Sequence, residues 1–159
     1  MIEKARNLDG FEYDESYEYI TGDMLDLRLI SFCEGNEVEI PYYWYDIILK
    51  DVNETIGKIS IRLGNNYHSY YNGHVGYEID EDYRGHNYAF VALQMVLNIA
   101  RDYGMQRVYI TCNDDNIASY KTIEKLPVEL VEKVIPPKDY FAYYEGMPVQ
   151  RIYSMKLNK

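Results

Sequence analysis

Short runs in which apolar and polar residues alternate recur along this chain, and each run predicts a β-strand. The first run, residues 25–32, places three leucines on one face of a strand and Asp26 and Arg28 on the other. Further runs, rich in aromatic and β-branched residues and bounded by turn residues, lie at 42–50, 56–63, 74–80, 107–112, 128–135 and 150–157. The pattern therefore predicts about seven strands.

Residues 88–103 follow a helical period instead. One polar stripe runs along an otherwise apolar helix, and it consists of Gln94, Asn98, Arg101 and Asp102. Asn87 is a suitable N-cap, and Gly104 is suited to the position just after the helix. A second, shorter helix is expected over 117–125, where the polar cluster 113–116 can cap its start.

The order of these elements predicts the fold class. The helix 88–103 lies between the strands 74–80 and 107–112, so we expect those strands to be parallel and joined by a right-handed crossover. Seven strands with two helices indicate an α/β (α+β) domain, a mixed sheet with helices packed on it. The 159 residues suit one domain with one core, and no repeat or linker is visible.

Composition narrows the function classes. A formal charge of −10 argues against nucleic-acid binding, which needs a basic surface. No apolar run is long enough for a membrane span, and the polar N-terminus predicts no signal peptide. Two isolated cysteines, Cys33 and Cys112, do not make a disulfide framework, which favours a reducing cytoplasm.

Two features of the composition stay open. Residues 1–23 form an acidic lead-in, which we interpret either as a solvated, partly ordered segment or as a flap beside a cationic acceptor. Tyrosine makes up 19 of the 159 residues. Many of these tyrosines lie either on strand faces and at the rim of the sheet or in an aromatic pocket.

The candidate chemistry lies between the strand 74–80 and the helix 88–103. The turn 83–89 ends at a helix N-terminus, where unpaired backbone N–H groups and the helix dipole suit a phosphate or pyrophosphate. Glu78 places a carboxylate in the middle of the preceding strand, where desolvation would make it a stronger base. The alternative is a carboxylate on a solvent-facing position of the sheet.

These segments resemble the GNAT acyltransferases (Gcn5-related N-acetyltransferases). The phosphate loop of that family reads Gln/Arg-x-x-Gly-x-Gly/Ala, and Arg84, Asn87 and Ala89 occupy the matching positions. A second match is Asn-Ile-Ala-Ser at 116–119 followed by Glu-Lys-Leu at 124–126, similar to the Asn-x-Ala-Ser…Glu-Lys-Leu-Gly segment of the branch that modifies ribosomal-protein N-termini. The resemblance spans roughly 46–157.

The resemblance implies a largely antiparallel mixed sheet in which the strands 74–80 and 107–112 splay apart to admit pantetheine. It implies acetyl transfer from acetyl-CoA, as a co-substrate, to a primary amine by direct attack in a ternary complex, with no metal. The acceptor would be a small-molecule or peptide amine. The residues implied in binding acetyl-CoA are Ile79, Arg84, Gly85, His86, Asn87, Tyr88, Ala89, Asn113, Asn116 and Ser119.

Within that resemblance, Glu78 is the candidate base, acting directly or through a water. Many family members carry a tyrosine where this chain has Ile123, which cannot donate a proton, and Tyr120 lies one helical turn away. Ser119 is therefore the candidate donor to the thiol, with plain helix capping as its alternative role. His74 shares the face of Glu78 but lies roughly 13 Å away along the strand, which indicates a structural or surface histidine.

Two further departures from the family leave other interpretations open. Asn87 replaces a glycine and could crowd the pyrophosphate, although asparagine tolerates a positive φ. Only about nine residues separate the first two predicted strands, where the family has one or two helices, so we expect a more open acceptor pocket. The alternatives are a non-catalytic CoA-binding module and a protein-interaction module that pairs edge strands into a homodimer.

Overall fold

The computed structural model describes residues 11–157. Its strands are β1 Tyr19–Thr21, β2 Leu25–Cys33, β3 Tyr42–Leu49, β4 Glu54–Arg62, β5 Val75–Ile79, β6 Arg107–Asn113, β7 Glu129–Val134 and β8 Gln150–Lys156. Its α-helices are α1 Tyr67–Asn72, α2 Tyr88–Asp102 and α3 Ile117–Ile123. Two short 3-10 helices, η1 Glu15–Tyr17 and η2 Glu81–Tyr83, complete it. The predicted mixed α+β fold is confirmed, and each of the seven predicted strands is present.

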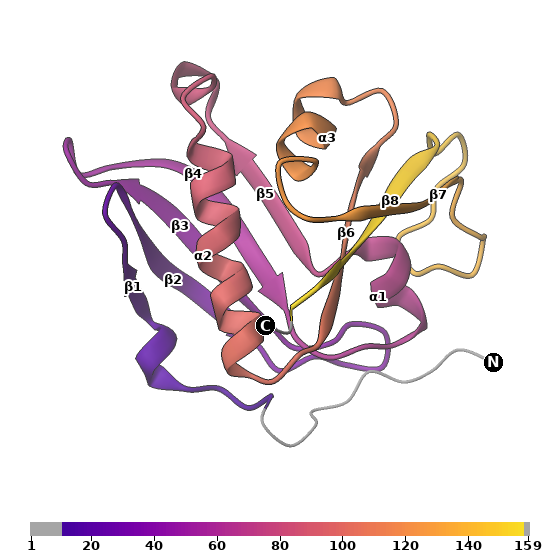
Figure 1. Cartoon of the computed structure of the whole chain (residues 1–159). Coiled ribbons are helices and arrows are strands. Elements are labelled where there is room, and N and C mark those ends of the chain that lie inside the picture. Colours follow the sequence, from indigo (N-terminus) through magenta and orange to yellow (C-terminus); the bar gives the residue numbers. More distant parts are fainter. Residues whose placement is uncertain (1–10, 158–159) are drawn as a thin grey trace.

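The strands form two sheets whose pairs are all antiparallel. One has the order β1-β2-β3-β4-β5 and the other the order β6-β8-β7. The chain passes from the first sheet to the second through α2, which runs across one face of the five-stranded sheet (Figure 1). β5 and β6 are therefore the facing strands of the two sheets, but they do not pair as a ladder.

His74 joins the two sheets at the start of β5. Its backbone N–H donates to the carbonyl of Tyr109 in β6 at 2.6 Å, the one backbone hydrogen bond between the two sheets in the part of the chain described. Its ring Nδ1 accepts from the N–H of Tyr109 at 2.9 Å, and Nε2 bonds the carbonyl of Gly64 at 2.8 Å. The His74 ring therefore accepts from the Tyr109 N–H, which in a regular ladder would donate to a backbone carbonyl of the facing strand. Beyond this point β5 and β6 do not pair. The prediction of a structural histidine is confirmed.

The apolar stripe of α2 packs on the five-stranded sheet, because leucines, valines and alanines recur along one side of the helix. Leu93, Val96 and Leu97 are almost fully buried against core residues such as Tyr45 and Ile59. The four residues of the predicted polar stripe are all exposed, which confirms the period. The other face of this sheet is not covered by α2.

The structure contains two elements that the sequence pattern does not predict. Residues 64–73 lie between two predicted strands with no element expected there, but 67–72 form α1, whose N-cap Asn66 makes a capping box with Ser69. β1 is a three-residue edge strand within the segment interpreted as an acidic lead-in, and it pairs with β2. Residues 1–10 of that segment lie outside the described residues.

Residues 34–41 connect β2 to β3 with no helix, and the more open acceptor pocket stays a prediction. No helix of the described chain has the length and hydropathy needed to cross a membrane. Many tyrosines pack into one aromatic cluster beside the C-terminal end of α2, where the Tyr43 and Tyr103 hydroxyls lie 2.6 Å apart. Others join α1 to the segment before β8, as Tyr71 and Tyr140 do.

Candidate active site

A cavity of about 1050 Å³ opens between the turn that precedes α2 and the helix α3. Its lining comprises Tyr77, Glu78, Ile79, Tyr83, Arg84, Gly85, His86, Asn87, Tyr88, Ala89, Phe90, Asn116, Ala118, Ser119, Thr122 and Lys125. The cavity thus brings together every residue predicted to bind acetyl-CoA except Asn113. The Asn113 side chain instead accepts a hydrogen bond from Gln150 at 2.6 Å and serves the β6–β8 pair.

The turn before α2 has the backbone conformation that a phosphate loop needs. Gly85 and Asn87 both have positive φ, +86° and +70°, so Asn87 adopts the left-handed conformation that glycine takes without strain. Asn87 is the N-cap residue of α2, as predicted, but its side chain makes no cap hydrogen bond, and its Oδ1 instead accepts from Lys125 Nζ at 2.6 Å. The left-handed backbone turns that side chain away from the helix amides.

The N-terminus of α2 is consequently open to an anion. The first intrahelical bond runs from the N–H of Val91 to the carbonyl of Asn87, so the N–H groups of residues 88–90 have no partner within the helix. The first turn of α2 contains no acidic residue that could compete for these groups. Unpaired amides and the positive end of the helix dipole converge here.

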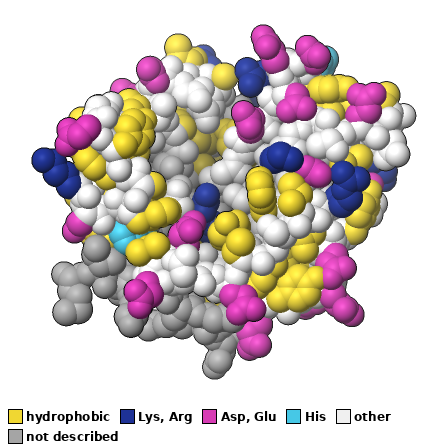
Figure 2. All heavy atoms as spheres, turned by 180° about the vertical axis from the view of Figure 1, so that it is seen from behind, with side chains coloured by type: hydrophobic (Ala, Val, Ile, Leu, Met, Phe, Trp, Pro, Cys, Tyr) yellow, Lys and Arg dark blue, Asp and Glu magenta, His cyan; other side chains and the backbone are white. Residues whose placement is uncertain are grey.

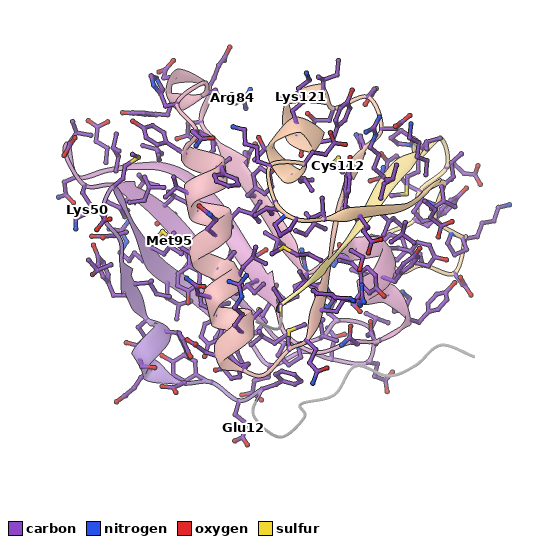
Figure 3. All side chains as sticks on the ribbon, viewed as in Figure 1. Glu12, Lys50, Arg84, Met95, Cys112 and Lys121 are labelled. Carbon is purple, nitrogen blue, oxygen red and sulfur yellow. The ribbon has the colours of Figure 1, made fainter. Side chains whose placement is uncertain are left out.

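Two cations flank this helix N-terminus. Arg84 lies in the turn before α2 (Figure 3), and its Nε donates to the carbonyl of Ile79 at 2.8 Å, which fixes the arginine at the end of β5. Lys125, just after α3, reaches the opposite side of the cavity. Two positive charges at one helix N-terminus favour a diphosphate.

At the inner end of the cavity, β5 meets α3 through two hydroxyl groups. The hydroxyls of Tyr77 and Ser119 lie 3.1 Å apart, and Ser119 N–H donates to Asn116 Oδ1 at 3.1 Å. Burial raises the pKa of Tyr77, so this phenol is protonated at neutral pH and can donate. Asn116 and Ser119 both line the cavity, and Asn116 also caps α3, while their roles toward acetyl-CoA stay predictions.

Cys112, on β6 beneath α3 in the view of Figure 3, borders this hydroxyl pair. Burial raises the pKa of the Cys112 thiol, and a hydrogen bond with Ser119 opposes that shift. The thiol is therefore neutral at ordinary pH and acts as a small packing group beside the hydroxyls.

Glu78 lines the cavity, but it is exposed, and the expected desolvation of this carboxylate is wrong. The reason is the strand period. Tyr77 points to the face covered by α2, so Glu78 points to the opposite face, in register with Lys58 of β4. The cavity therefore carries a partly buried proton donor from one face of β5 and an exposed carboxylate from the other.

The other tyrosine considered for the leaving group does not reach the cavity. The guanidinium of Arg151 lies 3.7 Å from the ring centre of Tyr120, which holds that side chain against β8. Ile123 is fully buried in the core. The pairing of Tyr77 with Ser119 and the reach of Lys125 were missed, although the alternation of 74–80 placed Tyr77 on the apolar face. Contacts between residues 42 positions apart leave no local signal.

Splayed facing strands, a helix N-terminus with a glycine turn, and a long cavity between them define an acyltransferase-like architecture of the GNAT type. A family model described as an acetyltransferase (GNAT) domain matches residues 11–128. The chain belongs to this family.

Solved structures share the fold at low sequence identity. A GNAT-family acetyltransferase from Bacillus anthracis is 14% identical with a TM-score of 0.63, covering 89% of this chain and 99% of its own. RimL, a ribosomal L7/L12 alpha-N-protein acetyltransferase, is 16% identical with a TM-score of 0.64, covering 91% and 98%. The microcin C7 self-immunity acetyltransferase MccE, solved with acetyl-CoA and AMP, is 18% identical with a TM-score of 0.54, covering 72% and 61%. The curated proteins contain no match.

Proposed function

We propose that this protein transfers the acetyl group of acetyl-CoA to a primary amine. The observation that carries the proposal is the cavity that joins an anion-accepting helix N-terminus to a partly buried hydroxyl pair. Family membership supports it, and so does the acetyl-CoA bound to MccE, a structure with the same fold.

The residues present fit the diphosphate of acetyl-CoA. The N–H groups of Gly85 to Ala89 would donate to its oxygens, and Arg84 and Lys125 would balance its charge. An added Cβ at Gly85 would meet nothing within 4 Å, so the space beside this turn is empty. Asn87 does not block the loop, because Lys125 holds its side chain.

The chemistry follows from the two faces of β5. Glu78 would take a proton from the acceptor's ammonium, directly or through a water, so that the free amine can attack the thioester carbonyl. The N–C bond forms and the C–S bond breaks. The Tyr77 and Ser119 hydroxyls would then supply a proton to the departing thiolate, and the second proton lost by the nitrogen restores the balance through solvent.

Glu78→Gln tests the proposed base. It removes the basic group but keeps the shape, so kcat should fall by about 10²- to 10⁴-fold while the affinity for acetyl-CoA stays within about twofold. Acetyl transfer can be followed by release of the CoA thiol, and acetyl-CoA affinity by calorimetry. Glu129→Gln, an exposed glutamate on β7, is the matched control.

An unchanged kcat would remove Glu78 from the mechanism. Saturable binding of acetyl-CoA by the native protein without transfer to any amine would favour the non-catalytic binding module instead.

A further inference from the structure

A row of charged residues crosses the face of the five-stranded sheet that α2 leaves uncovered, the face seen in Figure 2. Arg28, Asp46, Lys58 and Glu78 are in register on four neighbouring strands. Asp46 binds both cations, with Arg28 Nη2 at 3.1 Å and Lys58 Nζ at 2.8 Å. The side-chain carboxylate of Glu78, at the end of the row, makes no hydrogen bond or ion pair with any residue in 11–157, although its backbone pairs with β4.

Arg62 lies on the same face, two rows further along β4. Its guanidinium has five N–H donors. Within the described chain it makes one hydrogen bond, from Nη1 to the carbonyl of Gly73 at 3.3 Å, and it has no carboxylate within ion-pair distance. Glu39 and Tyr140 act on it only through longer-range electrostatics, and burial lowers its pKa without removing the charge. The guanidinium N–H groups that make no hydrogen bond within the described chain are not sealed from solvent, so they are available to a ligand.

The Arg62 guanidinium leans toward Gly76, the β5 residue that lies on this same face. A Cβ placed on Gly76 would lie 3.6 Å from Nη2 and 3.7 Å from Nη1 of Arg62. Because Gly76 has no side chain, nothing from β5 stands between the guanidinium and Glu78. Gly76 and Glu78 are two positions apart, or about 6.6 Å along the strand.

We propose that the acceptor is a small amino-carboxylate, a zwitterion of amino-acid size, whose carboxylate binds Arg62 and whose ammonium faces Glu78. The inference rests on the proposed acetyl transfer and specifies its substrate. Arg62 supplies a fork that binds a carboxylate with two parallel hydrogen bonds. Glu78 is both the free carboxylate on this face and part of the cavity lining, so an ammonium held there lies at the point where face and cavity meet.

The charged residues of this face explain why the proposed acceptor carries both a positive and a negative charge. An amine without an anion would leave the Arg62 donors idle and would place a cation near a guanidinium. The missing helix between β2 and β3 leaves this surface open to a small solute, and Figure 2 shows a hollow on it.

The test compares amino acids with amines that differ only by the carboxylate. The pairs are L-alanine with ethylamine, L-phenylalanine with 2-phenylethylamine, and 4-aminobutyrate with propylamine, each assayed by CoA release with saturating acetyl-CoA. We expect kcat/KM to be about tenfold or more higher for the amino-carboxylate of the best pair. Arg62→Gln should lower that value by about ten- to hundredfold through KM, leave the paired amine within about twofold, and leave acetyl-CoA affinity unchanged.

Two variants separate recognition from folding. Arg62→Lys keeps the charge and should retain part of the preference, whereas Arg28→Gln removes another arginine of the same face and should retain all of it. Thermal unfolding of each variant shows whether the fold persists.

Equal rates within every pair, or an equal loss for both members in Arg62→Gln, would overturn the inference while leaving acetyl transfer intact. A preference for 2-aminoethyl phosphate over β-alanine would mean that the anion site binds phosphate, and it would refute the proposal that the acceptor is a carboxylate. A preference for an N-terminal peptide amide would assign a protein acceptor and overturn the small zwitterion. No acetyl-CoA binding, or no transfer to any amine, would refute the proposed function and this inference together.

Discussion

Asn87 keeps the backbone of a glycine at a position where the family loop has one. Its φ of +70° is tolerated by asparagine more readily than by other residues with a Cβ. Lys125, 38 positions later, binds the side chain and holds it away from the amides of α2. The Lys125 hydrogen bond therefore compensates for the added side chain, and the loop keeps the positive φ that the family glycine would have.

Substitutions at Asn87 should separate the effect of its backbone conformation on acetyl-CoA binding from the effect of its side chain. Asn87→Gly keeps the positive φ and should leave acetyl-CoA affinity within about threefold. Asn87→Ala places a less tolerant residue in the left-handed region, at a cost of about 1–2 kcal/mol, and should weaken binding by about 5- to 30-fold. Calorimetric titration of both variants measures this, and equal affinities would mean that the loop does not depend on its left-handed residue.

The paired hydroxyls of Tyr77 and Ser119 should act after the amine attacks. Tyr77→Phe and Ser119→Ala each remove one hydroxyl, and we expect each to lower kcat by about 10²-fold or more with little change in acetyl-CoA affinity. The double variant should lose little more than the worse single one, because the two groups act as a unit. Tyr120→Phe is the control, since that ring stacks under Arg151. Fully additive losses would assign the hydroxyls separate roles.

At the scale of elements, β5 is held to β6 at one end by His74 and left free at the other. The ring is fully buried, accepts from the N–H of Tyr109 and bonds the carbonyl of Gly64. Burial lowers the pKa of His74 from 6.5 to about 4. The neutral ring thus fixes the point from which the two sheets open.

The unfolded chain binds more protons than the native one between the two pKa values of His74. Stability from the neutral ring is therefore complete above pH 6.5 and is lost as the pH falls toward 4, by roughly 3 kcal/mol in total. Urea unfolding at pH 7.0, 5.5 and 4.5 should show this loss, with an NMR titration of His74 to assign it. A His74 whose NMR signals titrate near pH 6.5 would contradict this result.

At the scale of the molecule, periodicity was enough to predict most of the architecture. The strands and α2 follow from their alternating and helical patterns, and Arg84 and Gly85 from the strand-to-helix turn. α1 escaped prediction because the residues 67–72 show no apolar stripe, and their aromatic rings pack on residues near 140, far along the chain. The contacts of Tyr77, Lys125 and Arg62 could not be predicted, since they join segments that only the completed fold brings together.

The edges of the molecule bear on the predicted homodimer. β1 and β7 are the outer strands described in the two sheets, and Leu130 and Val131 of β7 are 46% and 48% exposed. Exposed apolar residues on an edge strand are compatible with strand pairing between two copies. The homodimer stays a prediction.

Acetyl-CoA is expected to bind in the cavity between α2 and α3. A thermal-shift titration of the native protein with acetyl-CoA tests this binding most directly. Binding at about 100 times Kd should add roughly 2.7 kcal/mol, which for a chain of this length is a saturable rise in Tm of about 5–10 °C. Phe90→Glu, which puts an acid in the first turn of α2, should abolish the rise, and Leu130→Glu on β7 should not. No rise in the native protein, or an equal rise in Phe90→Glu, would contradict the account.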